Sequence, residues 1–244
     1  MAHDTPATRR GLHRSAEFET IRSVSVPAAA KPFLQSKTRG TGLVMFGVDN
    51  RATLVVKIPG VLTSAECAEL MEKIDRLGPH LAPINTAKGT RVRTDIRNNE
   101  RVIFDDLELA QRLYEKAKPH VPAEMFGFAI IGANERFRCY RYKPGMRFAP
   151  HTDGSFERNE AERSFYTYLV YLNEQFEGGE TIFATSPELS VKPITGMGLI
   201  FQHPLIHEGA EVVSGVKFVA RTDLMYRRFD QTPNGGNHAS LSNW

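Results

Sequence analysis

Residues 164–183 read SFYTYLVYLNEQFEGGETIF: a run rich in aromatic and β-branched residues, a glycine-containing break, and a second short apolar run. Such runs favour β-strands, and EGG between them is typical of a turn. Similar runs separated by turn signals extend in both directions, from NERFRCYRY (134–142) to VKFVARTDLMYRR (216–228). About eight strands without an intervening helix predict a β-sandwich or a β-barrel.

Two amphipathic helices are expected before these strands. The first, TSAECAELMEKIDRLG (63–78), has Thr63 or Ser64 as its N-cap and Gly78 as its stop signal. The second, DDLELAQRLYEKAKPHVP (105–122), carries acidic residues in its first turn and lysines in its last, as the helix dipole favours. We expect both helices to pack on the outside of the barrel.

The domain organisation follows from this change of pattern along the chain. We expect a single domain over residues 41–228, with helical support at 41–126 and the β-barrel at 127–228. Residues 1–40 are polar and aperiodic, and residues 229–244 are low in apolar content, so both are expected to be loose tails.

Composition excludes several kinds of partner. The formal net charge is only +3, which gives no support for nucleic-acid binding. No apolar run is long enough to span a membrane, and the first residues lack the apolar region of a secretory signal. Cys67 and Cys139 fall in a helical and a strand-like pattern, so we expect reduced, buried thiols in a cytoplasmic protein.

A histidine and an aspartate lie two apart in FAPHTDGSF (148–156). In a strand, His151 and Asp153 would project from the same face. Such a pair could hold a metal, orient a catalytic base, or be an ordinary surface pair. A facial triad of two histidines and one carboxylate binds iron(II) and leaves three coordination positions open. The second histidine would have to come from another strand.

Two candidates for that histidine occur in IFQHPLIHEGAEV (200–212). His203 precedes Pro204, which indicates a strand rim or a turn. His207 is followed closely by Gly209, which would let the backbone pass near a crowded site. The spacing alone leaves both candidates open.

A lysine and an arginine share one face of the last predicted strand. Lys217 and Arg221 alternate with apolar residues and fall on the same side as Val219. The opposite side is no more polar, so the pattern does not establish which side faces inward. Inside a barrel these cations would need an anion, and beside a metal they would suit an acidic co-substrate.

Three segments together resemble the iron(II)- and 2-oxoglutarate-dependent dioxygenases of the prolyl 4-hydroxylase type. They are YKPGMRFAPHTDGSF (142–156), YLVYLNEQFEGGETIF (168–183) and TGMGLIFQHPLIHEGAEVVSGVKFVARTDLMYR (195–227). H-x-D, the later H-E-G and a basic residue ten positions after that histidine occur in the family's order. The resemblance covers roughly residues 95–228 and implies a mainly β fold with flanking helices, a double-stranded β-helix or jelly-roll barrel.

The resemblance implies the cofactors and their ligands. Iron(II) would be bound by His151, Asp153 and His207, and Lys217 would pair with the distal carboxylate of 2-oxoglutarate. Arg221 is the rival for that role, because it shares the strand face of Lys217. Oxygen would be the second co-substrate and ascorbate the reductant, so L-ascorbic acid binding is also implied.

The resemblance further implies residues that line the co-substrate pocket. Tyr142 would direct its hydroxyl toward 2-oxoglutarate from the strand before H-x-D. Thr167, Leu169 and Tyr171 would line the pocket from a neighbouring strand, and Thr181 from the segment after the glycine pair. For the aromatic residues a plain core role is the alternative, and for Leu169 the two roles cannot be separated.

The sequence says least about the substrate. RVRTDIRNNERV (91–102) is rich in arginine, and Arg93 and Arg97 are candidates for substrate contacts, together with Asn134 and Arg136 on the following strand. The alternative to a substrate-binding role is that these residues form an ordinary solvent-exposed basic surface. If these residues line the mouth of the barrel, they would suit a carboxylate-bearing amino acid or peptide.

The expected activity is hydroxylation of an unactivated C–H bond in a prolyl or other residue of a peptide or protein, with release of succinate and CO₂. A free amino acid or small metabolite is the alternative substrate, and a non-catalytic barrel that binds a partner or senses oxygen is a third possibility. Asp153 favours hydroxylation, because halogenating relatives carry a small residue there. The expected partner is a peptide or a small molecule, without nucleic acid or membrane, and the oligomeric state is left open.

Overall fold

The computed structural model describes residues 19–21, 47–86 and 89–229. Every strand pair within these residues is antiparallel. In chain order the elements are β1 (Glu19–Ile21), β2 (Val55–Ile58), α1 (Ser64–Arg76), β3 (His80–Leu81), β4 (Ile84–Thr86), β5 (Gly89–Arg91), β6 (Glu100–Asp105), α2 (Leu107–Ala117), the 3-10 helix η1 (Lys118–His120), β7 (Glu124–Met125), β8 (Phe128–Ala133), β9 (Arg136–Tyr142), β10 (Phe148–His151), β11 (Glu162–Tyr171), β12 (Phe176–Gly178), β13 (Thr181–Phe183), β14 (Leu189–Val191), β15 (Gly198–Gln202), β16 (His207–Gly209), β17 (Val212–Gly215) and β18 (Lys217–Arg228).

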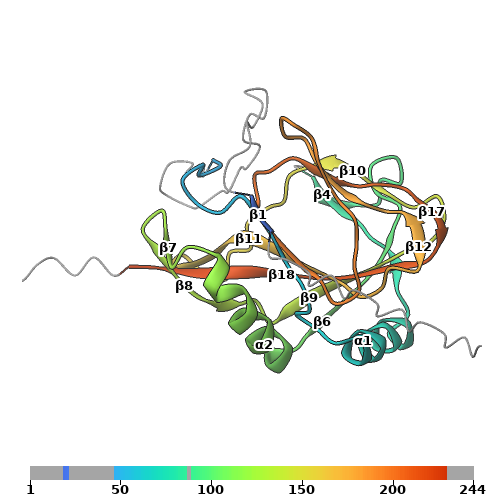
Figure 1. Ribbon diagram of the computed structural model, residues 1–244, viewed down its shortest axis with the longest axis horizontal. Helices are drawn as coiled ribbons and strands as arrows, with labels where there is room; N and C mark the ends of the chain where they lie inside the picture. The colour runs from blue at the N-terminus through green and yellow to red at the C-terminus, as the bar shows by residue number, and fades with distance from the viewer. Residues whose placement is uncertain (1–18, 22–46, 87–88, 230–244) are drawn as a thin grey trace, which may run out of the picture.

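Two sheets build the barrel. The larger follows the order β1-β2-β15-β11-β18-β9-β6-β3, with β8 on β18 and β7 on β8, and the smaller follows β10-β16-β13-β14. In Figure 1 the long strand β18 runs across one side of the barrel, and β10 lies across the interior from it. One core cluster joins Tyr140 and Val219 of the larger sheet to Phe183 and Val191 of the smaller. The expected mainly β, double-stranded β-helix fold is confirmed.

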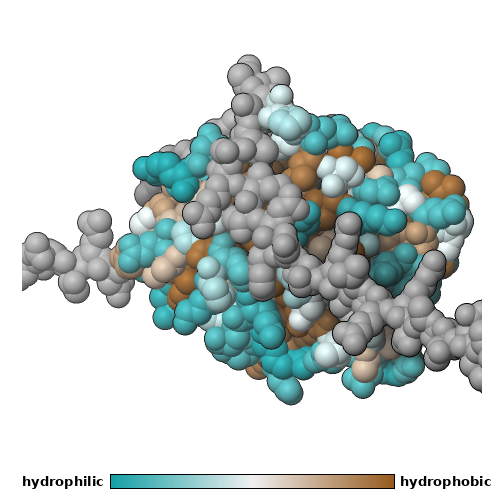
Figure 2. Space-filling view, in the orientation of Figure 1, coloured by the Kyte–Doolittle hydropathy of each residue, from teal (hydrophilic) through white to brown (hydrophobic). Residues whose placement is uncertain are grey.

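The two helices cover the outer side of the larger sheet. α1 begins after Thr63, whose side chain and that of Glu66 form a capping box, and α2 begins after Asp106, which caps the Leu109 amide. Their buried faces join the same core cluster as Phe137 on β9. Figure 1 shows both helices below β6 and β9, and the outward side of α2 is mostly hydrophilic in Figure 2.

Much of the two expected tails lies outside the described residues. Within the first, β1 pairs with β2 and extends the edge of the larger sheet, so this part of residues 1–40 has regular structure. Cys67 and Cys139 are both buried and unpaired, as expected. None of the helices in the described ranges has the length and apolar character needed to cross a membrane.

Candidate metal and co-substrate site

Three side chains converge where the smaller sheet meets the loop after β10. His151 ends β10 and pairs in register with His207, which begins β16. The Nε2 atoms of His151 and His207 lie 3.8 and 3.6 Å from the Asp153 carboxylate oxygens. One ligand atom from each of the three residues lies within 4.8 Å of the other two. The structure therefore brings together the triad expected from the sequence.

Both histidines present the nitrogen that a metal requires. The Nδ1 of His151 lies 2.8 Å from the Ala149 carbonyl oxygen, and the Nδ1 of His207 lies 2.9 Å from that of Leu205. A carbonyl only accepts, so each Nδ1 carries the proton and each Nε2 keeps a lone pair. Burial lowers the pKa of His207, and burial and then His207 lower that of His151 to about 3, so both rings are neutral at pH 7.

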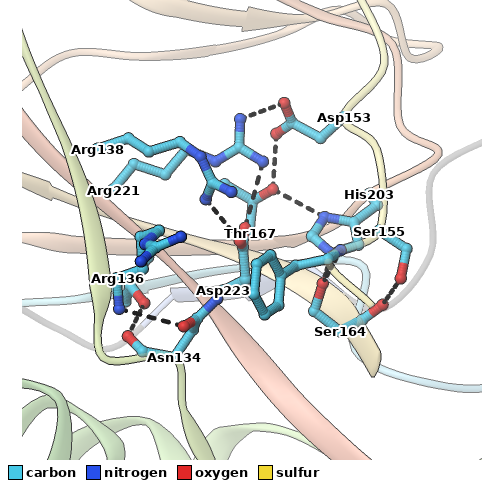
Figure 3. Close-up of polar contacts among 12 residues, drawn as sticks. Asn134, Arg136, Arg138, Asp153, Ser155, Ser164, Thr167, His203, Arg221 and Asp223 are labelled. Atoms are coloured by element: carbon cyan, nitrogen blue, oxygen red, sulfur yellow. Dashed lines mark hydrogen bonds and ion pairs between the residues drawn. The ribbon is translucent and has the colours of Figure 1, made fainter. Parts of the chain in front are cut away.

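Asp153 is held in its ionised form from both sides. Arg221 Nη1 donates to one carboxylate oxygen at 2.5 Å, and Thr167 Oγ1 donates to the other at 2.6 Å, as Figure 3 shows. Burial alone would raise the pKa of Asp153, but Arg221 and then the neighbouring histidines lower it. Each oxygen accepts one hydrogen bond and keeps a further lone pair. The three side chains thus fit iron(II), a metal suited to imidazole and carboxylate ligands.

His203, the other candidate ligand, supports the triad instead. Its Nε2 lies 2.7 Å from Ser164 Oγ and its Nδ1 lies 2.9 Å from Thr167 Oγ1, so neither ring nitrogen is free for a metal. Because Thr167 donates to Asp153, it must accept from His203, which in turn accepts from Ser164 (Figure 3). This chain of hydrogen bonds fixes the Asp153 carboxylate. Ser164 could not be identified from the sequence, because these hydrogen bonds join segments that are far apart in it.

Lys217 and Arg221 have different partners. Lys217 Nζ donates to the Gly179 carbonyl at 2.6 Å and lies 5.1 and 5.6 Å from the ring centres of Tyr142 and Tyr171. No carboxylate of the described chain lies within ion-pair distance of it, and burial lowers its pKa to about 7. Arg221 by contrast contacts both Asp153 and Asp223. Lys217 is therefore the cation available for an added carboxylate.

The glycine pair lets the backbone approach Lys217. Gly178 and Gly179 have φ values of +73° and +70°, a region that other residues rarely adopt. A Cβ on Gly178 would collide with the Glu211 carbonyl oxygen, and one on Gly179 would lie 3.2 Å from Lys217 Cδ. Just beyond the pair, Thr181 Oγ1 lies 2.6 Å from the Tyr171 hydroxyl.

Two cavities meet at the triad. The smaller, here called the inner cavity, is lined by Tyr142, Leu169, Thr181 and Lys217 among others. The larger, the outer cavity, has a volume of about 530 Å³. Both cavities are lined by Tyr140, Phe148, His151, Asp153 and Arg221. Thr167 and Tyr171 line neither and act through their hydrogen bonds.

The candidate substrate residues are divided. Arg97 is buried and lines the outer cavity. Arg93 does not line it, since its exposed side chain pairs with Asp95. The expectation that Asn134 and Arg136 face the mouth is also not met by their positions, because neither lines the inner or the outer cavity.

The reasons for this difference are local. Asn134 is fully buried and accepts from the backbone amide of Arg136, whose guanidinium pairs with Asp105 on β6. The arginines that do reach the outer cavity, besides Arg97 and Arg221, are Arg101 and Arg138. Arg138 shares a strand face with Arg136, but alternation does not indicate how far along a strand the cavity extends.

Comparison with known proteins places this site in a family. Residues 137–222, which include the triad and Lys217, match the 2OG-Fe(II) oxygenase superfamily. The chain is 24% identical over 191 residues to prolyl 4-hydroxylase 1 of Arabidopsis thaliana, covering 68% of this chain and 66% of that protein. It is 30% identical over 115 residues to a putative prolyl 4-hydroxylase of Acanthamoeba polyphaga mimivirus, covering 39% of this chain and 46% of that protein. The match thus spans less than two thirds of either curated relative.

A solved structure supports the fold. A prolyl hydroxylase from Trichoplax adhaerens, in complex with a hypoxia inducible factor oxygen degradation domain peptide fragment, aligns with a TM-score of 0.53 at 16% identity. The alignment covers 70% of this chain and 82% of that one. The family implies iron(II) and 2-oxoglutarate, which the intact triad fits. The sequence match over residues 137–222, the barrel and the convergent ligands identify this region as a domain of the 2OG-Fe(II) oxygenase superfamily.

Proposed function

We propose that this protein is an iron(II)- and 2-oxoglutarate-dependent hydroxylase acting on a C–H bond of a prolyl or other residue in a peptide or protein. The observation that carries the proposal is that His151, Asp153 and His207 lie where two cavities meet, with Lys217 in only one of them. Bound iron(II), with 2-oxoglutarate and oxygen, supplies the oxidising chemistry and yields succinate and CO₂.

The residues of the chain divide the remaining work. The two histidines and Asp153 hold the metal, and Thr167 and Arg221 orient the aspartate. Lys217 binds the distal carboxylate of 2-oxoglutarate in the inner cavity, where burial excludes water and strengthens the ion pair. The Tyr142 hydroxyl lies beside Gly209 in the same cavity and can contact the co-substrate.

The outer cavity is the place for the substrate. A volume of about 530 Å³ is within the range of small-ligand sites and suits a single residue of a peptide. The names of the relatives from Arabidopsis thaliana and the mimivirus favour a prolyl substrate, and the peptide bound to the Trichoplax adhaerens protein favours a peptide. A free amino acid is the second candidate, because the cavity also carries unpaired arginine nitrogens. The unpaired thiols favour a reducing compartment, and we propose the cytoplasm.

Succinate formation tests the proposal. The purified protein is supplied with iron(II), 2-oxoglutarate and ascorbate, first alone and then with proline-containing peptides and free amino acids. We expect slow succinate release without substrate and faster release, with a product heavier by one oxygen atom, when the correct class is added. His207→Ala should abolish both, whereas Arg227→Gln, an exposed residue paired with Glu162, should retain both. No succinate under any condition would contradict the proposal and favour a binding module.

A further inference from the structure

Four arginines line the outer cavity. Arg221 contacts Asp153, and the other three, which we call the arginine cradle, are Arg97, Arg101 and Arg138. The acidic residues lining the same cavity are Asp153 and Glu157. Because Asp153 is a proposed metal ligand, its charge is not available to balance the cradle once iron(II) is bound.

The sheet register forces these cations together. Arg138 on β9 stands directly opposite Arg221 on β18, and Arg101 on β6 stands opposite Tyr140 on β9. Directly opposed side chains on one sheet face are about 5 Å apart at Cβ, and like charges in such a pair are destabilising. Arg97 reaches the same region through a bridge to Phe148, and its guanidinium lies 4.3 and 4.5 Å from the ring centres of Phe148 and Tyr140.

The available carboxylates do not neutralise the cradle. Arg138 and Arg221 share Asp223, whereas Arg97 donates to the neutral amide of Asn99 and forms no ion pair with a carboxylate of the described residues. Arg97 is 6% exposed, and its Nη2 is buried without a hydrogen-bond partner. Among the described residues, no acceptor pairs with the guanidinium of Arg101.

The titration of neighbouring groups reflects this excess of positive charge. Burial would raise the pKa of Tyr140, but Arg97, Arg221 and Arg138 together lower it. Burial lowers the pKa of Arg101, and the other three arginines lower it further against the opposing effect of Tyr140. A buried donor without a partner is destabilising, and an anionic ligand that accepted from Arg97 Nη2 would remove this cost.

We propose that the substrate carries a carboxylate, and that Arg97 and Arg101, with Arg138 beside them, bind it in the outer cavity. This rests on the proposed function and narrows its substrate to a carboxylic acid, either a free or N-acylated amino acid or a peptide with an acidic side chain or C-terminus at this position. Guanidinium groups match the planar carboxylate in bidentate fashion. Ile84, Ile96 and Phe156 provide apolar walls for the carbon skeleton of an organic acid.

The test uses pairs of compounds that differ only in charge. The probes are the N-acetyl derivatives of the common amino acids and a short proline-containing peptide, each prepared as the acid and as the amide. Binding is measured by equilibrium dialysis without oxygen, in the presence of iron(II) and saturating 2-oxoglutarate, so that turnover is not required. We expect at least one acid to bind at least about ten-fold more tightly than its amide.

Variants of single arginines identify the residues that cause the preference for the acid over the amide. Arg101→Gln should remove the preference for the acid, and Arg97→Gln should do the same, while Arg227→Gln should preserve it. Arg101 has no structural ion pair, so this variant should fold even if the buried Arg97 variant does not. Binding of 2-oxoglutarate to Arg101→Gln, measured by the same dialysis, reports whether this arginine acts on the substrate or on the co-substrate.

Several outcomes would overturn the inference: no acid binds, the amides bind equally well, or the preference persists without Arg101. Tighter binding of inorganic phosphate or phosphoserine than of any carboxylate would also overturn it, as would a loss of 2-oxoglutarate affinity in Arg101→Gln. Selective binding of the small acids would indicate an amino acid as the source of the carboxylate, and selective binding of the peptide acid would indicate a peptide. A protein that binds acids selectively but forms no succinate would refute the proposed function and leave the cradle assignment intact.

Discussion

Replacing Lys217 by methionine should make the protein more stable and unable to bind 2-oxoglutarate. The side chain is 3% exposed, and burial lowers its pKa from 10.5 to about 7. Because of this difference of about 3.5 pH units, burying the ammonium lowers the free energy of unfolding by about 5 kcal/mol at low pH. Methionine has a similar length and removes this cost.

One opposing effect reduces the gain. Lys217 Nζ donates to the Gly179 carbonyl, and leaving a buried carbonyl without a donor costs about 1–3 kcal/mol. We therefore expect Lys217→Met to raise the free energy of unfolding by about 2–4 kcal/mol at pH 6. A folded-state pKa below the unfolded value means that the cost is complete below about pH 7 and disappears as the pH rises toward 10.5. At pH 9 only about 2 kcal/mol remains, so the two proteins should be nearly equal in stability.

The assay has two parts. Urea unfolding at pH 6 and pH 9, without metal or co-substrate, gives the difference in stability, and succinate formation at increasing 2-oxoglutarate concentrations gives the change in affinity. Arg227→Gln serves as the control for both. A variant that is less stable than the parent at pH 6, or that keeps its 2-oxoglutarate dependence, would refute the assignment of Lys217 as a desolvated cation reserved for the co-substrate.

Three further changes probe the supports of the site. Arg221→Gln removes a hydrogen bond to Asp153, so the iron(II) affinity should fall about 10–100-fold in a metal titration; an unchanged affinity would show that Thr167 suffices. Tyr171→Phe removes the contact with Thr181 and should cost about 1 kcal/mol in thermal unfolding, which an unshifted Tm would contradict. Thr63→Ala breaks the α1 capping box and should also lose about 1 kcal/mol in urea unfolding while kcat is retained; a drop in kcat would mean that α1 influences the site.

The strands and helices were predictable because their signals are local. The apolar run at 164–173 lies largely in β11, and the expected helices at 63–78 and 105–122 appear as α1 and α2, the second ending at Ala117 before the 3-10 helix η1. The wider fold came from a resemblance, because strand runs alone do not distinguish a sandwich from a barrel. The edge strand β1 was missed, since three residues carry no periodic pattern.

The site was predictable only in part for a related reason. A sequence motif indicates possible metal ligands but not the residues that hydrogen-bond to them. The choice between His203 and His207 therefore stayed open on spacing alone. Their difference lies in long-range contacts: His203 bonds to Ser164 and Thr167 on β11, whereas His207 faces Asp153. On β9 the sequence suggested Arg136, whereas Arg138 is the arginine of this strand that lines the outer cavity, because alternation predicts a face but not how far along the strand the cavity extends.

Strand geometry explains why two cations on one face of β18 have different roles. Lys217 and Arg221 are four residues apart, and at about 3.3 Å per residue their Cα atoms are separated by about 13 Å. The two cations also differ in their partners, because Arg221 is paired with Asp153 and Asp223, whereas Lys217 Nζ donates to the Gly179 carbonyl. Lys217 lines only the inner cavity, beside the glycine turn, whereas Arg221 lines both cavities. Two residues that strand alternation leaves indistinguishable in the sequence are therefore distinguished by their partners, with Lys217 as the proposed co-substrate cation and Arg221 as the residue that hydrogen-bonds Asp153.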